Sequence, residues 1–442
     1  MSFPMDSIST TVSAHQRLRQ LERRYGLVVM LNWFAATLPS AVIVLYAQSR
    51  GLTLANIGLY VAVYSATVAL LDLPTGNLAD VVGRKRVALA SYSLAALARL
   101  ILLFAVSLPG FICFAVVWGL ARALGSGALE AWFVSSVREI DPEANLQPRL
   151  ARINTRELLA ISAGSLIGAA LPTLMGKLAP LWIQQTSSGA WSPLAGVVAC
   201  SLLLHLATLG VTWRVVHEPP LSHRSVLSAL QQGFRSLPSA LREAGRTIGS
   251  DRLLLRLLTL ELVTGLMLAA SETYWQPFFA TRFGLGGPNT VVFGVLLGGC
   301  FLAGTLGNIC AGPLIGWLGG RVGRLGMLTQ VVQAGALLTL AWQGSVWLAA
   351  GLFWLTYFAR TAFSSPFMTL YNGQVPDGRR SLMLSVLSVA MFVGVSVGNL
   401  VLGAVSSRWS ISWAWTLMAG VLLLSIPVVA RLRQPETQSA GR

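Results

Sequence analysis

Ionisable residues stand inside long apolar stretches of this 442-residue chain, and they are the first candidates for chemistry. A charge in hydrocarbon is costly, so such a group generally faces a cavity, a partner or a ligand. A desolvated carboxylate can take up and release a proton, and a guanidinium can hold an anionic group. The residues in question are Arg122, Glu130, Glu261, Glu272 and Arg360.

The carboxylates are candidates to carry protons. Glu261 and Glu272 lie about three helical turns apart, which predicts that both fall on one face of a helix, separated by about 16 Å of rise. Glu272 stands deeper in its apolar stretch, so we expect it to be the proton carrier. Glu261 is either a second proton site or a partner for nearby arginines, and Glu130 is suited to either task.

The arginines are candidates to bind a solute or to couple its movement. Arg122 and Arg360 stand near the middle of two different apolar stretches, where they either contact a substrate or form buried structural pairs. Tyr357, Arg360 and Ser364 share one helical face by their spacing. Further residues expected at the substrate site are Asn32, Trp33 and Trp275.

Composition places these residues in a membrane protein. The chain is 54% hydrophobic and 11% charged, with a mean hydropathy of +0.66, whereas soluble domains carry about 25% charged residues. This excludes most soluble enzymes, and we find no catalytic motif. The four cysteines lie in apolar stretches without metal-ligand spacing, so neither a metal nor a cofactor is expected.

Twelve apolar stretches are long enough to span a bilayer, six on each side of a polar connection. They cover residues 26–47, 56–79, 87–107, 111–137, 154–176, 193–215, 255–281, 290–318, 325–343, 346–372, 381–405 and 411–430. The predicted organisation is a tail (1–25), a first bundle (26–215), a linker (216–252), a second bundle (253–431) and a short tail (432–442).

Charge distribution predicts the orientation of these spans. The net charge is +16, and almost all basic residues fall in the loops on one side. By the positive-inside rule both termini are cytosolic, and the charge indicates topology rather than nucleic-acid binding. In the linker Leu227, Leu230, Phe234, Leu237 and Leu241 follow helical spacing, which predicts an amphipathic helix on the inner leaflet, attracted to anionic lipid.

The loop between the second and third spans carries a recognisable motif. The segment from Asp72 to Lys85 reads DLPTGNLADVVGRK and resembles motif A, GxxxDxxGRK, of the major facilitator superfamily. Gly76 permits close helix approach, Gly83 permits a tight turn, and Asp80 can pair with Arg84. A weaker copy follows in the second half, with Gly320 where Asp80 stands, so the halves look like repeats of one unit.

The resemblance implies a fold and a function. The expected fold is an all-α integral membrane protein with twelve transmembrane helices in two pseudo-symmetric six-helix bundles. Spans 1, 4, 7 and 10 of this family line the cavity, which would place Arg122 and Arg360 on opposite walls. The resemblance also places Arg99 at the periphery, where we expect it to pair with Asp72.

The function expected from this resemblance is proton-coupled secondary transport of a small organic solute by alternating access, in the plasma (inner) membrane. Motif A residues Asp72, Gly76, Asp80, Gly83, Arg84 and Lys85 would gate the movement. Organic-anion carriage and drug or cation efflux both remain open, and the second function class is a non-transporting sensor or assembly protein. Expected partners are the solute, protons and membrane lipids, with no nucleic acid and a monomeric chain.

Overall fold

The computed structural model describes residues 5–75, 78–178, 192–218, 226–285 and 290–432. Within these ranges every regular element is a helix. The first half contains α1 (Met5–Thr37), α2 (Ile43–Ser49), α3 (Leu54–Thr75), α4 (Leu78–Val82), α5 (Arg84–Phe104), α6 (Leu108–Gly125), α7 (Ala128–Ile140), α8 (Gln147–Leu178) and α10 (Pro193–Val215).

A linker helix and the second half follow. They contain α11 (Val226–Ser250), α12 (Arg252–Leu268), the π-helix η1 (Ala269–Thr273), α13 (Trp275–Phe283), α14 (Val291–Trp317), α15 (Val322–Trp342), α16 (Val346–Gln374), the 3-10 helix η2 (Asp377–Arg379), α17 (Arg380–Arg408) and α18 (Ile411–Ala430).

Membrane-crossing helices dominate the chain. Among the described residues, eleven helical stretches are long and apolar enough to cross a bilayer. The predicted first span is divided instead, because α1 ends at Thr37 and α2 begins at Ile43, with Pro39 in the turn between them. The chain is an all-α integral membrane protein.

Two other predicted spans are interrupted, and both interruptions concern candidate site residues. The fourth span divides at Ser126 and Gly127, where the glycine adopts a φ of +74° that side chains rarely tolerate. The seventh span passes through η1, a single wide turn that carries Glu272. Such π turns inside helices are frequent at functional sites.

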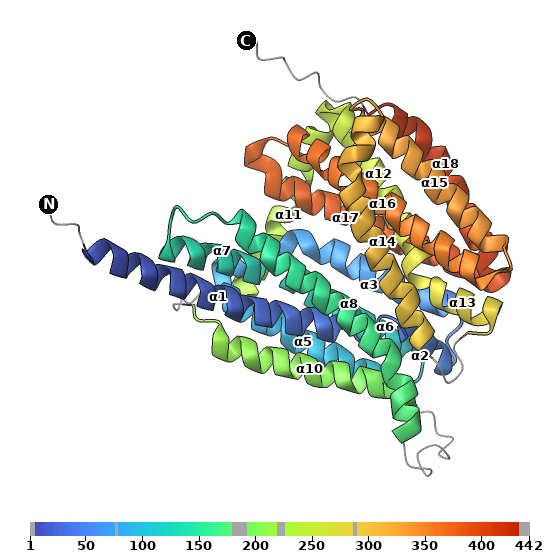
Figure 1. The fold of residues 1–442 in the computed structure, drawn as a ribbon, viewed down its shortest axis with the longest axis horizontal. Coiled ribbons are helices and arrows are strands. Elements are labelled where there is room, and N and C mark those ends of the chain that lie inside the picture. The colour runs from blue at the N-terminus through green and yellow to red at the C-terminus, as the bar shows by residue number, and fades with distance from the viewer. Residues whose placement is uncertain (1–4, 76–77, 179–191, 219–225, 286–289, 433–442) are drawn as a thin grey trace.

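The two halves lie side by side and converge at one end (Figure 1). We call the end at which α1 begins and α18 ends the terminal end, and the end at which α3 and α14 begin the far end. In the described part of the chain, every hydrogen bond between residues 26–215 and 253–431 lies toward the far end. The halves are therefore fastened on one side of the membrane.

Helices α3 and α17 form one of these contacts. Ser396 Oγ donates to the Ala62 carbonyl at 3.0 Å, and the Ala55 amide donates to Ser407 Oγ at 2.7 Å. Gly58 lies against the Asn399 carbonyl so closely that an added β-carbon would collide with it. Small residues permit this approach, as is usual between membrane helices.

Helices α8 and α14 form the equivalent contact, and Gln276 adds a third. Thr290 Oγ1 donates to the Ala169 carbonyl at 2.5 Å. The buried side chain of Gln276, in α13, donates to the Ser40 carbonyl at 2.7 Å and accepts from the Val44 amide at 3.1 Å. One amide group thus fastens the seventh span to the turn that divides the first.

The linker helix α11 crosses the terminal end and contacts both halves. Gly233 packs on Pro74 at the end of α3, and Glu243 forms an ion pair with Arg379 at 2.9 Å. Phe234 and Leu241 stay about half exposed, consistent with a helix whose second face meets lipid. The side chains of Leu227 and Leu230 lie outside the described residues.

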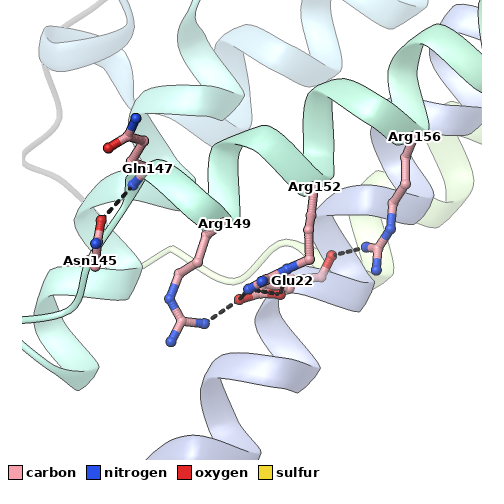
Figure 2. A network of polar contacts seen from close by, with 6 residues as sticks. All are labelled: Glu22, Asn145, Gln147, Arg149, Arg152 and Arg156. Carbon is pink, nitrogen blue, oxygen red and sulfur yellow. Dashed lines mark hydrogen bonds and ion pairs between the residues drawn. The ribbon is translucent and has the colours of Figure 1, made fainter.

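A polar network ties α1 to α8 at the terminal end. Figure 2 shows Arg149 and Arg152 of α8 converging on the Glu22 carboxylate of α1, while Arg156 donates to the Glu22 backbone carbonyl at 2.9 Å. Glu22 is only 6% exposed. One buried carboxylate therefore balances two guanidinium groups and fixes the relative position of the two helices.

Replacing Glu22 should destabilise the first half. Glu22→Gln leaves Arg149 and Arg152 without their shared counter-charge, and breaking a buried ion pair costs about 3 kcal/mol. We expect the melting temperature of the detergent-solubilised protein to fall by several degrees, measured by intrinsic fluorescence. Glu139→Gln, at an exposed position of α7, is the matched control. Equal melting temperatures for the two variants would contradict the assigned role.

Replacing Gln276 should loosen the far end. Gln276→Leu removes two hydrogen bonds between the halves and leaves the Ser40 carbonyl and Val44 amide unsatisfied, a cost of about 1–2 kcal/mol in this conformation. Spin labels are attached at positions 49 and 409, one on each half, after the native cysteines have been replaced. The distance between the two labels should be long in a larger fraction of molecules than in the unmodified protein. Gln343→Leu, whose side chain bonds within its own half, is the control. An unchanged distance distribution in Gln276→Leu would refute the fastening role.

Candidate functional site

A large cavity lies between the two halves. It has a volume of about 930 Å³ and is bounded by α8 from the first half and by η1, α14 and α16 from the second. Four of the predicted site residues line it, namely Glu272, Tyr357, Arg360 and Ser364. We call this space the central cavity.

The charged groups of the central cavity meet around one tyrosine. Tyr357 Oη donates to Glu272 Oε1 at 3.1 Å, and the Arg360 guanidinium lies 5.1 Å from the centre of the Tyr357 ring. The ring is buried, whereas Glu272 is exposed to the cavity. This arrangement presents a carboxylate and a guanidinium to the same space without pairing them directly.

A second cavity of about 350 Å³ lies within the first half. It collects the predicted residues Asn32, Trp33, Arg122 and Glu130, which come from α1, α6 and α7. Glu157 of α8 also lines it, although we did not single this residue out from the sequence. Arg122 and Glu130 are exposed there, so the break after α6 lets both side chains reach one space.

A third cavity of about 250 Å³ lies within the second half. Glu261, Arg360 and Ser364 line it, so Arg360 and Ser364 stand at the boundary with the central cavity. Gln330 and Gln333 of α15 line it as well, and both are buried. The Gln330 Oε1 atom has no hydrogen-bond partner, which leaves a polar atom without a bond in this cavity.

The two arginines carry no counter-ion from the protein. Among the described residues, neither Arg122 nor Arg360 forms an ion pair, in contrast to Arg84, Arg149, Arg152 and Arg379. The buried structural pairs that we considered for them are not formed in this conformation. Both guanidinium groups are available to an anionic group in the cavities that they line.

Of the candidates on the seventh span, both carboxylates line cavities, whereas the expected substrate contact of Trp275 is not formed in this conformation. Glu261 lines the third cavity and Glu272 the central one, and Arg360 lines both. Glu272 lies in the π turn of η1. Trp275 is 2% exposed and stacks on Phe353 at 5.6 Å, so it is a core residue in this conformation.

The expected pairing of Arg99 with Asp72 is also wrong. Arg99 stands about 22 Å along α5 from the terminal end, where Asp72 lies, because each residue adds 1.5 Å. It is buried, donates to the Ala36 carbonyl at 3.2 Å, and lies 4.0 Å from the centre of the Trp118 ring. Asp72 accepts from Ser126 Oγ at 3.4 Å instead.

The motif A loop forms a polar junction at the terminal end. Arg84 pairs with Asp80 at 3.1 Å and donates to Ser135 Oγ at 2.5 Å. Gly83 adopts a φ of +112° at the start of α5, as the tight turn requires. The Glu218 carboxylate accepts from the Arg84 and Lys85 amides at 3.0 and 2.8 Å, which caps α5. Gly76 lies outside the described residues.

Several residues of the cavities and of the motif A junction were not predicted, because their sequence patterns are weak. Glu157 directly follows a segment with three arginines, so it resembled part of a charged loop at the start of its span. Gln330 and Gln333 carry no charge and stand at helical spacing, and Glu218 is a single carboxylate after the sixth span. In the described residues no three His, Cys, Asp or Glu side chains are grouped to hold a metal ion.

Solved structures with the same fold are membrane transporters. The nucleoside transporter NupG superposes with a TM-score of 0.70 at 12% identity, covering 93% of this chain and 100% of that one. A bacterial homologue of the human lysosomal transporter Spinster, in an inward-facing and unoccupied conformation, gives 0.65 at 14% identity, covering 93% and 94%.

The human organic anion transporter MFSD10 gives 0.56 at 18% identity, covering 92% of this chain and 99% of that one. No curated protein sequence is similar to the chain at a significant level. The family model described as Major Facilitator Superfamily matches residues 25–372 and 305–442, which together span nearly the whole sequence. The chain therefore belongs to the major facilitator superfamily.

Proposed function

We propose that this protein is a secondary active transporter that moves a small organic solute bearing an anionic group, by alternating access and with coupling to protons. One observation carries the proposal. Between the halves lies a cavity with an exposed carboxylate and an arginine without an ion pair, while the hydrogen bonds between the halves lie at one end. A solute site with one closed side is what alternating access requires.

The closed end is the outer one if the charge distribution sets the topology. With both termini cytosolic, the far end faces outward and the cavity is reached from the cytosol. Small residues, single hydrogen bonds and a shared apolar cluster close the far end, and contacts formed at the terminal end would replace them in the opposite conformation. The protein would work as a monomer in the plasma (inner) membrane.

The arginines favour an anionic solute over a cationic drug. Arg360 in the central cavity and Arg122 in the first-half cavity would hold the anionic group, with Asn32, Trp33, Tyr357 and Ser364 contacting the rest. A guanidinium forms paired hydrogen bonds to carboxylate or phosphate, which a cation could not use. The fold also serves an organic anion transporter and a nucleoside transporter, so it accommodates such solutes.

Proton coupling would centre on Glu272. Its hydrogen bond from Tyr357 and its place beside Arg360 mean that a proton on this carboxylate changes the charge that the solute meets. Glu261 stands beyond Arg360 in the third cavity, and Glu130 with Glu157 would act near Arg122. Protonation of these carboxylates would remove negative charge near each arginine that otherwise repels the anionic group.

The motif A junction would take part in this cycle by holding the first half together. Asp80, Gly83, Arg84 and Lys85 join the third span to α7 and, through Glu218, to the end of α10. These contacts keep the first half rigid at the terminal end. The half can then rotate as one body against α11 and the second half.

Removing the arginine charges should weaken solute binding. Arg360→Gln and Arg122→Gln each lose charge-assisted hydrogen bonds worth about 1.5–3 kcal/mol, or about tenfold to a hundredfold in affinity. Counterflow in proteoliposomes with a panel of carboxylates, phosphate monoesters and lipophilic cations measures this, with Arg408→Gln as the exposed control. Preference for cations, unaffected by either change, would favour drug efflux, and no counterflow of any compound would favour the non-transporting class.

Neutralising Glu272 should separate exchange from accumulation. Glu272→Gln imitates the protonated carboxylate, so solute counterflow should persist while accumulation driven by a pH gradient is lost. Uptake with and without an imposed gradient measures the difference, and Glu139→Gln is the control outside the cavities. Accumulation that matches the unmodified protein would remove Glu272 from the proton pathway.

A further inference from the structure

The wall of the central cavity changes from polar to apolar toward the membrane. On the two helices at its edge, apolar side chains both line the cavity and are 44–70% exposed on the protein surface. They are Leu158, Leu159, Leu166, Val295 and Leu302. The cavity wall is therefore continuous with the lipid-facing surface of α8 and α14.

The two edge helices pack closely at Leu166 and from there toward the far end. Gly294 and Gly298 lie against Leu166, Gly294 also lies against Ala169, and Thr290 bonds to Ala169. Along the described parts of α8 and α14, no hydrogen bond joins the helices from Gly294 toward the terminal end. A gap with apolar edges at this depth opens to the hydrocarbon of the bilayer, not to water.

The wall of the same cavity away from these leucines carries charged groups. Gly298 and Gly299 present no side chains, and the Trp354 indole lies over Gly299 while donating to the Leu296 carbonyl at 2.9 Å. Glu272, Tyr357 and Arg360 line the cavity as well. A ligand that fills the space would thus meet apolar side chains of α8 and α14 and the Arg360 guanidinium.

We infer that the substrate is an amphiphile with a single hydrocarbon chain and an anionic head group, which enters sideways between α8 and α14. The head group, a phosphate or carboxylate, pairs with Arg360, and the chain lies against the leucines of the two edge helices. Burying the chain there supplies affinity that a small polar anion would lack. The inference rests on the proposed transport function and specifies its substrate class.

Three probes separate this substrate class from soluble anions. Proteoliposomes receive radiolabelled oleoyl lysophosphatidate, which has chain and charge, glycerol 3-phosphate, which has the charge alone, or monooleoylglycerol, which has the chain alone. We expect protein-dependent transfer of lysophosphatidate between leaflets, measured by extraction with albumin. We expect neither of the other probes to be transported, and glycerol 3-phosphate should not compete.

Matched variants test the sideways entry. Leu302→Trp fills the gap between α8 and α14. The rate of lysophosphatidate transfer should fall about tenfold or more. Leu306→Trp is the control, because Leu306 is 56% exposed one turn along α14 and does not line the cavity. Arg360→Gln should reduce transfer about tenfold to a hundredfold through loss of the head-group contact.

A photoreactive chain provides a readout on the unmodified protein. Lysophosphatidate with a diazirine in its chain should label peptides of α8 and α14 near positions 158 and 302, and unlabelled lysophosphatidate should prevent it. Labelling confined to other helices, or equal transfer by Leu302→Trp and Leu306→Trp, would overturn the inference.

The outcomes also separate this inference from the proposed function. Transport of glycerol 3-phosphate or another soluble anion, with lysophosphatidate neither moved nor bound, would overturn the amphiphile and leave an anion transporter. Failure of every probe and every soluble anion to exchange would overturn both.

Discussion

A charge inside a membrane helix must meet an opposite charge, a polar cavity or a ligand, and the arrangement of this protein follows from how each one does so. At the terminal end, just before the predicted first span, Glu22 is buried and balances two arginines of α8, which ties α1 to α8. Arg99 is buried against Trp118 and the Ala36 carbonyl. Arg122 and Arg360 have no such arrangement, and both line cavities. The same constraint thus separates structural charges from those available for function.

The second constraint is that the halves must come apart and meet again. Their contacts at the far end combine glycines, hydroxyl groups and one amide side chain with an apolar cluster to which both halves contribute, for example Leu38 and Phe278. Opening this end exposes part of that cluster, so contacts formed at the terminal end must replace what is lost. The linker helix α11 limits the movement at the opposite end, where Glu243 and Gly233 hold it to different halves.

Much of this arrangement could be predicted from the sequence, because the length of an apolar stretch indicates a membrane span and helical spacing indicates which residues share a face. The predicted membrane class and superfamily are confirmed, and Tyr357, Arg360 and Ser364 line one cavity as helical spacing indicated. Prediction was incomplete where the helix is irregular. The π turn of η1 carries Glu272, and no pattern in residues 269–273 predicts a wider turn. The predicted pair of Arg99 and Asp72 is not formed because the two residues lie at different depths along their helices.

The halves resemble each other in architecture but differ in their chemistry at the terminal end. In the first half Asp80, Arg84 and Glu218 form a charged junction around Gly83, whereas in the second half Gly320 replaces the aspartate and Arg324 donates to the Leu318 carbonyl. The first half therefore has the more extensive polar junction at this end, while in the second half Arg360 stands between two cavities, where a local change of charge acts on both.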